Sequence, residues 1–430
     1  MKGPCPVDIA IWNALFSLCL WLDRAPLAKQ AMMGAQSFDI AIAGGGLSGS
    51  LITLALAARR PEIRVALVDA GTIGGNHVWS FFGTDVAAGD RARVDPLVAA
   101  RWDDGYDIAF PTYSRTLGTS YRSITSERLA MAVSAALPED AVFTRCPVTA
   151  LDAGGLTLAD GTRIEAGAVI DARGLAREHL SHLRGGWQKF TGQMVETSGP
   201  HGLARPVVMD ASVTQHDGYR FVYCLPFSET SVFVEDTYYS DGPALDPDLL
   251  KSRVADYAAA RGWQIAALSR TETGVLPVVT GGDFAALWRD VPDGVALAGT
   301  RAGLFQPLTS YSLPDAVRFA SMIADLPDLS GPAIAAAAKA HAQAHWKAGR
   351  FYRMLAAMLF GAARPDERYK VLQRFYRLDE GLVERFYAGK STPFDMARVL
   401  AGKPPVPLSR AIKVLAGIGA PGHLGAREQG

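Results

Sequence analysis

Short apolar runs alternate with glycine-rich turns in the first part of the chain, and the same pattern returns near residue 295. The runs at 38–43, 65–68 and 168–171 have the length of buried strands, and a mostly apolar, alanine-rich helical stretch follows the first of them. A fourth run at 294–298 enters another glycine-containing loop. The pattern predicts an α/β unit to which the chain returns late in the sequence.

The middle of the chain has a different texture. Residues 207–210, 219–223 and 231–235 are rich in β-branched and aromatic side chains and are separated by turns. They predict a mostly antiparallel sheet that carries one helix, at about 247–261. From about residue 331 onward the pattern becomes helical, and it ends in a Pro/Gly-rich tail.

These patterns predict a mixed α/β and α+β architecture. We expect a Rossmann-type nucleotide-binding domain, an antiparallel-sheet substrate domain and a helical C-terminal region. The expected boundaries are an N-terminal extension at 1–36, the nucleotide-binding domain at 37–186 and 291–330, the substrate domain at 187–290 and the helical region at 331–430.

A glycine motif directly after the first strand is the most specific signal. Gly44-Gly45-Gly46-Leu47-Ser48-Gly49 opens the helix, and Asp69 ends the next strand. This is the dinucleotide-binding fingerprint in its expected context. Gly44 would allow the tight turn, and Gly46 would let the backbone approach a pyrophosphate. Gly49 would let the helix pack closely on the sheet, and Asp69 would accept from a ribose hydroxyl; the alternative is a glycine turn in an ordinary α/β domain.

Composition narrows the function classes. The 430 residues hold 43 basic and 43 acidic side chains, so no global positive field favours a nucleic-acid partner. The four cysteines are widely spaced and fit neither a disulfide framework nor a metal site. His77 has no second ligand at suitable spacing, so we expect no metal, and we expect a reducing, cytoplasmic compartment.

An apolar stretch from Ile9 to Leu22 stands apart at the start of the chain. It is too short to span a bilayer comfortably, and it has no obvious signal-peptide cleavage site. It could be an interfacial helix with Trp12 and Trp21 at the headgroups, or the true start could be Met32 or Met33. We expect no transmembrane helix elsewhere.

Five longer motifs occur in one order along the chain. They are GGNHVWSF at Gly74–Phe81, DGYRFVY at Asp217–Tyr223, FVEDT at Phe233–Thr237, RAGLFQPLTSYSLP at Arg301–Pro314 and RFYAGK at Arg385–Lys390. Together they resemble the bacterial lycopene β-cyclase family, from about residue 38 to residue 407. Three positions depart from that pattern, with Gln306 in place of histidine, Ser310 in place of glycine and Ala172 in place of a frequent glycine.

The resemblance implies a flavin-monooxygenase-like fold that binds FAD in the nucleotide-binding domain. It implies a redox-neutral enzyme that uses reduced FAD to close the ends of lycopene into β-ionone rings, giving γ-carotene and then β-carotene. NADPH or another reductant would keep the flavin reduced.

The resemblance also implies further cofactor-binding residues. Asp171 and Gly174 look like a second flavin-site segment, and Gly299 and Gly303 look like a third. Arg128, at a predicted helix start, would reach the pyrophosphate or the ribityl chain. The alternative for Arg128 is a solvated surface side chain.

Ring closure needs a proton delivered to an alkene carbon and a carbocation shielded from water. A buried glutamate can supply that proton when burial raises its pKa. Glu235 lies on an apolar strand, and we expect it to be the general acid. Asp236 would face the opposite side of a regular strand and support Glu235, by holding its loop or by raising its pKa. The alternative for this acidic pair is the solvent-exposed end of a strand.

The cation would be stabilised by the anionic reduced flavin and by aromatic faces. Candidates for these faces, or for the lining of a polyene tunnel, are Trp79, Phe81, Tyr219, Phe221, Tyr223 and Phe233. Each could instead belong to the core of a β-rich domain. Two rival functions remain, a redox flavoenzyme of the geranylgeranyl reductase or hydroxylase type and a non-catalytic, flavin-containing carotenoid-binding protein.

Lycopene is insoluble in water, so it must arrive from lipid. Residues 351–360 form an apolar helical stretch among eight basic residues, Lys347, Arg350, Arg353, Arg364, Arg368, Lys370, Arg374 and Arg377. Such a segment can lie on an anionic membrane, and the alternative is a core-facing helix with a charged back. We expect peripheral association with the inner face of the membrane.

Overall fold

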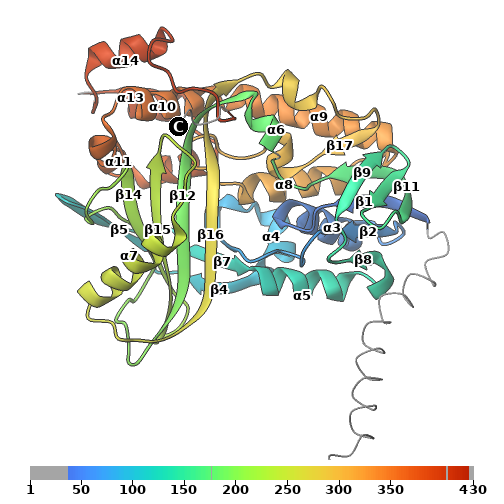
Figure 1. The fold of residues 1–430 in the computed structure, drawn as a ribbon, viewed down its shortest axis with the longest axis horizontal. Coiled ribbons are helices and arrows are strands. Elements are labelled where there is room, and N and C mark those ends of the chain that lie inside the picture. The colour runs from blue at the N-terminus through green and yellow to red at the C-terminus, as the bar shows by residue number, and fades with distance from the viewer. Residues whose placement is uncertain (1–36, 176, 403–404, 426–430) are drawn as a thin grey trace, which may run out of the picture.

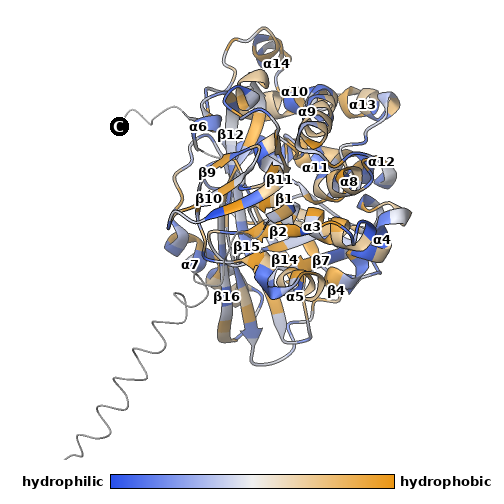
Figure 2. Cartoon of the chain, turned by 90° about the vertical axis from the view of Figure 1, so that its right-hand side faces the viewer, coloured by the Kyte–Doolittle hydropathy of each residue, from blue (hydrophilic) through white to orange (hydrophobic). Residues whose placement is uncertain are grey.

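Two large sheets and the helices around them make up the fold (Figure 1). The structure is a computed structural model that describes residues 37–175, 177–402 and 405–425. The apolar stretch Ile9–Leu22, with Cys5 and Cys19, therefore lies outside the described residues. Apolar positions concentrate on the strands and on the helix faces turned toward them (Figure 2).

The first sheet contains the predicted buried strands. Its members are β1 (Ser37–Ala43), β2 (Val65–Val68), β8 (Val142–Phe143), β9 (Val148–Asp152), β10 (Gly155–Leu158), β11 (Arg163–Asp171) and β17 (Val295–Leu297). The order is β8-β2-β1-β11-β10-β9, and β17 also pairs with β11. Strands β8, β2, β1, β11 and β17 pair in parallel. Strand β10 pairs antiparallel with both of its neighbours, β11 and β9. The late return of the chain to this sheet, through β17, is confirmed.

Helices from distant parts of the chain pack on this sheet. They are α3 (Leu47–Arg59), α5 (Ser126–Ala136), α8 (Leu313–Ala324) and α9 (Gly331–Ala348). Helix α3 contacts α5 and α8, and α9 contacts β11 and β17. One core joins Ile40 and Ile42 of β1 with Leu51 of α3, Phe319 of α8 and Ile334 of α9. The residues that follow β17 thus complete the core of the Rossmann-type unit.

The second sheet is the predicted antiparallel one. Its strands are β5 (Tyr106–Phe110), β6 (Tyr113–Leu117), β12 (Leu183–Thr197), β13 (Val207–Asp210), β14 (Tyr219–Pro226), β15 (Ser231–Ser240) and β16 (Ile265–Gly282). The order is β16-β12-β15-β14-β13-β5-β6, and only β13 and β5 pair in parallel. Helix α7 (Pro247–Ala260) packs against β12 and β15.

The domain boundaries stay a prediction. Strands β5 and β6 come from the stretch 37–186 but pair within the sheet assigned to 187–290. A small sheet from the same stretch, in the order β3-β7-β4, consists of β3 (Val78–Phe82), β7 (Tyr121–Thr125) and β4 (Val98–Trp102). The short helix α4 (Ala88–Val94) lies between β3 and β4 in the chain. Another short helix, α6 (Arg177–Leu180), lies between β11 and β12.

The C-terminal region is helical, as predicted. After α9 come α10 (Arg350–Gly361), α11 (Arg368–Phe375), α12 (Glu380–Tyr387), α13 (Pro393–Leu400) and α14 (Leu408–Leu415). Helix α10 packs on β16 and β12 through Ala356, Leu359 and Phe360, so the core-facing alternative for this apolar segment is the one observed. No helix in the described ranges is long and apolar enough to cross a membrane.

Two of the eight basic residues around α10 are buried. The Arg353 guanidinium lies 3.9 Å from the centre of the Trp346 ring, and burial lowers the pKa of Arg353 to about 10. Arg368 pairs with Asp241 at 2.7 Å and lies 4.5 Å from the centre of the Phe360 ring. These two cations stabilise the fold and are not available to a membrane surface.

Candidate active site

Three loops meet at the carboxyl ends of adjacent parallel strands. Ala43, Asp171 and Leu297 are register partners across β1, β11 and β17, so the turns that follow them lie side by side. These turns carry the glycines predicted from the fingerprint and from the second and third segments. Ligands of open α/β sheets bind at this edge. The structure therefore brings together the predicted cofactor-binding residues of all three segments.

The glycine turn after β1 leaves room for a phosphate. Gly44 has a φ of +103°, and a Cβ at Gly49 would lie 1.9 Å from the Gly44 carbonyl oxygen, so α3 can start this close only without side chains there. A Cβ at Gly46 would meet nothing within 4 Å. Helix α3 begins at this point without a side-chain cap, and the buried Ser48 hydroxyl has no partner among the described residues. Free N–H groups and a free hydroxyl fit a pyrophosphate.

Asp69 orients the same turn. Its Oδ2 accepts from the Gly45 N–H at 2.7 Å, and its Oδ1 accepts from the Gly71 N–H at 2.7 Å. A carboxylate has about four lone-pair sites, so these two contacts leave acceptor capacity on Asp69. Its contact with a ribose hydroxyl stays a prediction.

Asp171 joins the second and third loops. Its buried carboxylate pairs with Arg173 at 2.9 Å and with Arg301 at 2.6 Å. Arg301 also donates to the Gly174 carbonyl at 3.3 Å. The loop Gly299–Gly303 begins and ends on left-handed glycines, with φ values of 59° and 75°. Asp171 therefore holds the second and third loops together through Arg301.

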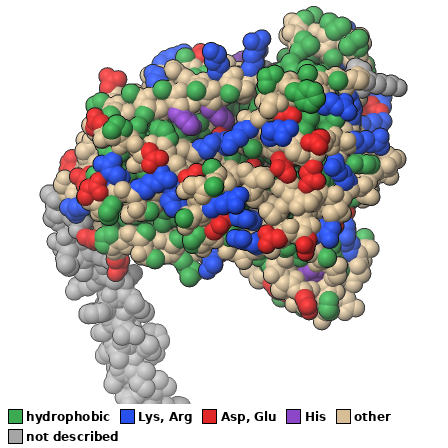
Figure 3. Space-filling model, turned by 180° about the vertical axis from the view of Figure 1, so that it is seen from behind, with side chains coloured by type: hydrophobic (Ala, Val, Ile, Leu, Met, Phe, Trp, Pro, Cys, Tyr) green, Lys and Arg blue, Asp and Glu red, His purple; other side chains and the backbone are tan. Residues whose placement is uncertain are grey.

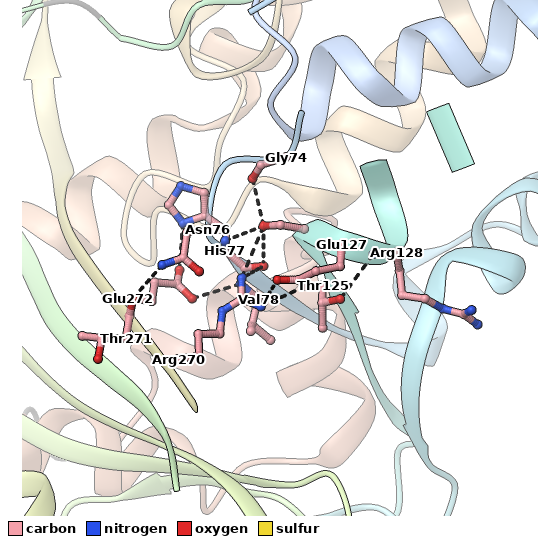
Figure 4. Close-up of polar contacts among 11 residues, drawn as sticks. Gly74, Asn76, His77, Val78, Thr125, Glu127, Arg128, Arg270, Thr271 and Glu272 are labelled. Atoms are coloured by element: carbon pink, nitrogen blue, oxygen red, sulfur yellow. Dashed lines mark hydrogen bonds and ion pairs between the residues drawn. The ribbon is translucent and has the colours of Figure 1, made fainter. Parts of the chain in front are cut away.

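Arg128 lies apart from this group. It is exposed in the first turn of α5, and its guanidinium donates to the Val98 carbonyl at 3.4 Å. In Figure 4 its side chain points away from Glu272. Contact between Arg128 and a cofactor stays a prediction.

Glu235 lies near the middle of β15, in register with Gly192 on β12 and Tyr223 on β14. The Thr237 hydroxyl donates to its Oε1 at 2.6 Å. Burial and then the negative charge of Glu272 raise the pKa of Glu235 to about 8, against the opposing Thr237 hydrogen bond. A carboxyl with this pKa keeps its proton near neutral pH, which is the property that a general acid needs.

Asp236 is fully buried on the opposite face of β15, as the strand period predicts. Arg220 Nε donates to its two carboxylate oxygens at 3.1 and 2.9 Å. Arg220 also donates to the Thr214 carbonyl at 2.9 Å. Burial raises the pKa of Asp236 and the Arg220 guanidinium lowers it. The pair anchors β15 to the turn before β14. The geometry therefore favours the alternative in which Asp236 supports Glu235 by holding its strand in place.

A second carboxylate on the face of Glu235 is not singled out by the sequence. Gly192 is the register partner of both Glu235 and Glu272, so the three positions form one row across β15, β12 and β16. We call this the carboxylate row. A Cβ at Gly192 would lie 2.3 Å from the Phe233 ring, which fills the space over the glycine. The only sequence signal for Glu272 is one carboxylate between two threonines, a pattern equally typical of a surface strand.

The loop Gly74–Val78 ties the glycine turn to the carboxylate row. The Gly74 N–H donates to the Gly45 carbonyl at 2.8 Å. At the other end of the loop, His77 Nδ1 lies 2.8 Å from Glu272 Oε1, and the Val78 N–H donates to Glu272 Oε2 at 3.0 Å (Figure 4). One loop therefore joins the carboxylate row to the glycine turn that follows β1.

Most of the predicted aromatic residues accompany Glu235. The alternation of β14 and β15 places four of them on its face, namely Tyr219, Phe221, Tyr223 and Phe233. The Tyr223 hydroxyl donates to the Tyr121 hydroxyl at 2.9 Å. Phe81 lies instead in the core of the first sheet, and the Trp79 ring packs beside His77.

A cavity of about 630 Å³ opens farther along the same sheet face. Its lining includes Met194 and Arg270, register partners that lie two residues beyond the carboxylate row on β12 and β16. Arg270 forms an ion pair at 3.0 Å with Glu127 of α5, one of the helices that pack on the first sheet (Figure 4). The cavity thus borders the sheet face that carries the acids, and neither Glu235 nor Glu272 is among its lining residues.

The described residues contain no group of three or more His, Cys, Asp or Glu side chains that could hold a metal ion. Cys146 and Cys224 are free thiols, and Cys224 is buried.

Solved structures share the fold. An FAD complex of Klebsiella pneumoniae HpxO aligns with a TM-score of 0.53 at 18% identity, over 86% of this chain and 100% of that chain. The tetracycline destructase Tet(51) aligns with a TM-score of 0.54 at 13% identity, over 84% and 100%. The chain therefore has a Rossmann-type flavoprotein fold.

Sequence comparison is more specific. A lycopene beta-cyclase of Pseudescherichia vulneris is 46% identical over 374 residues, which are 87% of this chain and 96% of the relative. A lycopene beta-cyclase of Pantoea ananas is 42% identical over 379 residues, 88% and 98% of the two chains. The family model described as "Lycopene cyclase protein" matches residues 39–413. The resemblance seen in the five motifs is confirmed, and the chain belongs to the lycopene cyclase family.

Proposed function

We propose that this chain is an FAD-dependent lycopene β-cyclase, which closes the acyclic ends of lycopene into β-ionone rings to give γ-carotene and then β-carotene. The observation that carries the proposal is Glu235, whose pKa of about 8 keeps its carboxyl protonated at neutral pH on an aromatic-lined sheet face. The names of relatives at 42–46% identity support the same activity.

FAD would lie along the edge where the three loops meet. The start of α3, with Gly46 and Ser48, fits the pyrophosphate, and Asp69 fits a ribose hydroxyl. When bound and reduced, the flavin would supply negative charge beside a developing cation. NADPH or another reductant would keep it reduced.

The residues of the chain account for the acid step. Glu235 donates its proton to an alkene carbon at the end of the substrate, and Thr237 holds the carboxyl in place. The next double bond attacks the cation to close the ring, and a proton then leaves a ring carbon. Atoms and electrons balance, so the product has the mass of the substrate. Aromatic faces such as Phe221 and Tyr223 would each stabilise the cation by about 0.5–2 kcal/mol.

The rival functions make different products. A reductase of the geranylgeranyl type adds hydrogen to its substrate and a hydroxylase adds oxygen, whereas a carotenoid-binding protein leaves its ligand unchanged. The relatives at 42–46% identity favour none of these.

The decisive experiment is expression in a lycopene-accumulating bacterium, with chromatography and mass analysis of the pigments. We expect cyclised product with unchanged mass from the wild type. Glu235→Gln should retain FAD and lose at least about 100-fold in turnover, because the amide cannot donate the proton. Normal β-carotene formation by this variant would contradict the general-acid assignment, and a change of product mass would favour a redox flavoenzyme.

We also propose that the protein associates peripherally with the inner face of the membrane, through α13 and α14 in place of α10. Six large apolar side chains are exposed there, namely Phe394, Leu400, Leu408, Ile412, Leu415 and Ile418. We call them the C-terminal apolar patch. Hydrophobic side chains gather at this corner of the molecule, at the upper right of Figure 3. Leu408, Ile412 and Leu415 form one stripe of α14, while Ala411 and Val414 pack in a cluster with α10.

The charges near the patch suit anionic lipid. Exposed cations lie on the same helices or just before them, namely Lys390, Arg398, Arg410 and Lys413. Asp395, the one acidic residue between 390 and 425, is buried and pairs with Arg385 at 2.7 Å. Apolar side chains beside cations favour an anionic membrane surface over a neutral one.

A further inference from the structure

The carboxylate row places two acidic side chains on the same face of the second sheet. Glu235 and Glu272 lie on the outer two of three adjacent strands, roughly 10 Å apart at their Cα atoms. Gly192 puts no side chain between them, and the space over it is filled by the Phe233 ring. Charges in such surroundings are screened far less than charges in water.

The loop Gly74–Val78 binds both oxygens of the Glu272 side chain. The Val78 N–H can only donate, so Glu272 Oε2 accepts at 3.0 Å. Oε1 lies 2.8 Å from His77 Nδ1, which donates when the ring carries its proton there. Glu272 itself is buried, whereas the His77 side chain is 48% exposed.

We propose that Glu272 is a positioning residue of this site: its negative charge, fixed by Val78 and His77, keeps the Glu235 carboxyl protonated until the proton is delivered to the alkene. The inference rests on the proposed function and adds to it a second carboxyl group, which sets the pH range of activity. Glu272 acts through Glu235, and no proton passes through it to the substrate.

The other charged and titratable groups around Glu235 do not replace Glu272. Asp236 lies on the opposite face of β15 and is paired with Arg220. Tyr223 on β14 stays neutral because burial raises its pKa far above the usual range. After burial, Glu272 is the largest influence that raises the pKa of Glu235.

Glu272→Gln in the full-length, FAD-loaded protein tests the inference. The amide oxygen can still accept from the Val78 N–H, but the charge is lost. Glu235 is active when protonated, so kcat/KM of the wild type should fall as the pH rises through about 8. In Glu272→Gln the midpoint of this fall should move about one pH unit lower, because removing a like charge lowers the pKa of Glu235. Activity well below the midpoint should largely remain.

Two variants make the result specific. Glu272→Asp keeps the charge and should keep the wild-type midpoint even if its rate falls. Glu196→Gln removes a carboxylate on β12 that accepts from Ser231 at 2.9 Å, and it should leave the midpoint unchanged. If Glu272→Gln did not fold, Glu272→Thr would replace it, because threonine also occupies both flanking positions of the strand. We expect the same lowering of the midpoint in Glu272→Thr.

An unchanged midpoint in Glu272→Gln, or an equal shift in Glu272→Asp, would overturn the inference. Failure of the proposed function would look different, because the wild type would then form no cyclised product at any pH.

Discussion

At the scale of single residues, two carboxyls that adjoin in sequence do different work. Glu235 faces aromatic rings and has a pKa raised to about 8, whereas Asp236 faces Arg220 and forms an ion pair with it. The strand period alone predicts this division, because successive side chains alternate between faces. Glu272 could not be predicted in the same way, since it meets Glu235 only through a register across a third strand.

Asp236→Asn should destabilise the protein strongly. The change leaves the buried Arg220 guanidinium without its charged partner, and breaking a buried ion pair on one side costs about 3–5 kcal/mol. The free energy of unfolding from denaturant titration measures this loss. Asp248→Asn, at an exposed pair with Lys251, is the control and should leave the unfolding midpoint unchanged. Equal stability of Asp236→Asn and the wild type would show that the pair does not anchor β15.

Two departures from the family pattern have structural explanations. Gln306 is buried, and its Oε1 accepts from the N–H groups of Leu308 at 2.6 Å and Thr309 at 3.0 Å, so it holds a turn. Ser310 has a φ of +55°, a conformation that favours glycine, which is the residue expected there. Its hydroxyl donates to the Pro277 carbonyl at 2.7 Å and thereby ties the loop to β16.

At the scale of elements, prediction succeeds where the signal is local. The unit β1-α3-β2 is specified by apolar runs and by glycines within one stretch of chain, and the structure has it at those residues. It is less successful where tertiary packing decides which face is covered. Helices α10 and α14 are both amphipathic, and only contacts with the large sheet show that the apolar side of α10 is buried while part of that of α14 is not.

Gly49→Ala should disrupt the junction of β1 and α3. Its Cβ would lie 1.9 Å from the Gly44 carbonyl oxygen, so the start of α3 would have to move away from the glycine turn. We expect the purified variant to retain at most a tenth of the flavin absorbance per protein chain. Gly89→Ala is the control, because a Cβ there would meet nothing within 4 Å. Full flavin content in Gly49→Ala would contradict the assignment of this turn to the pyrophosphate.

At the scale of the whole molecule, the loops that follow the parallel strands also touch the antiparallel sheet. Gly74–Val78 reaches Glu272, and the Val279 N–H of β16 donates to the Pro307 carbonyl at 2.8 Å. The sequence predicts both sheets and the late return of the chain. It does not predict how they meet, since these contacts join residues far apart in the chain.

Replacing Ile412 and Leu415 together by Asp should weaken membrane binding. Burying one such side chain contributes about 1.5–3 kcal/mol, so sedimentation with phosphatidylglycerol vesicles should show at least a tenfold loss of affinity. Wild-type binding should be stronger to these vesicles than to phosphatidylcholine vesicles, and it should weaken as salt is added.

Met131→Asp is the matched control for this experiment. Met131 is 63% exposed, similar to the 58% of Ile412 and the 60% of Leu415, but it lies on α5. Equal vesicle binding by all variants would exclude the C-terminal apolar patch as the lipid contact. A wild-type dimer that dissociates in the double variant, without vesicle binding, would instead assign the patch to a second copy of the chain.

The missing side chain at Gly192 suggests a different way to search for this chemistry. The two acids stand 37 positions apart in the sequence, and each sits in a short segment that many strands could contain. What distinguishes them is a three-strand signature, in which a residue without a side chain separates two acids and an aromatic ring covers it. Scanning backbone registers for that arrangement could identify proton-donating sheets in proteins whose linear motifs have diverged beyond detection.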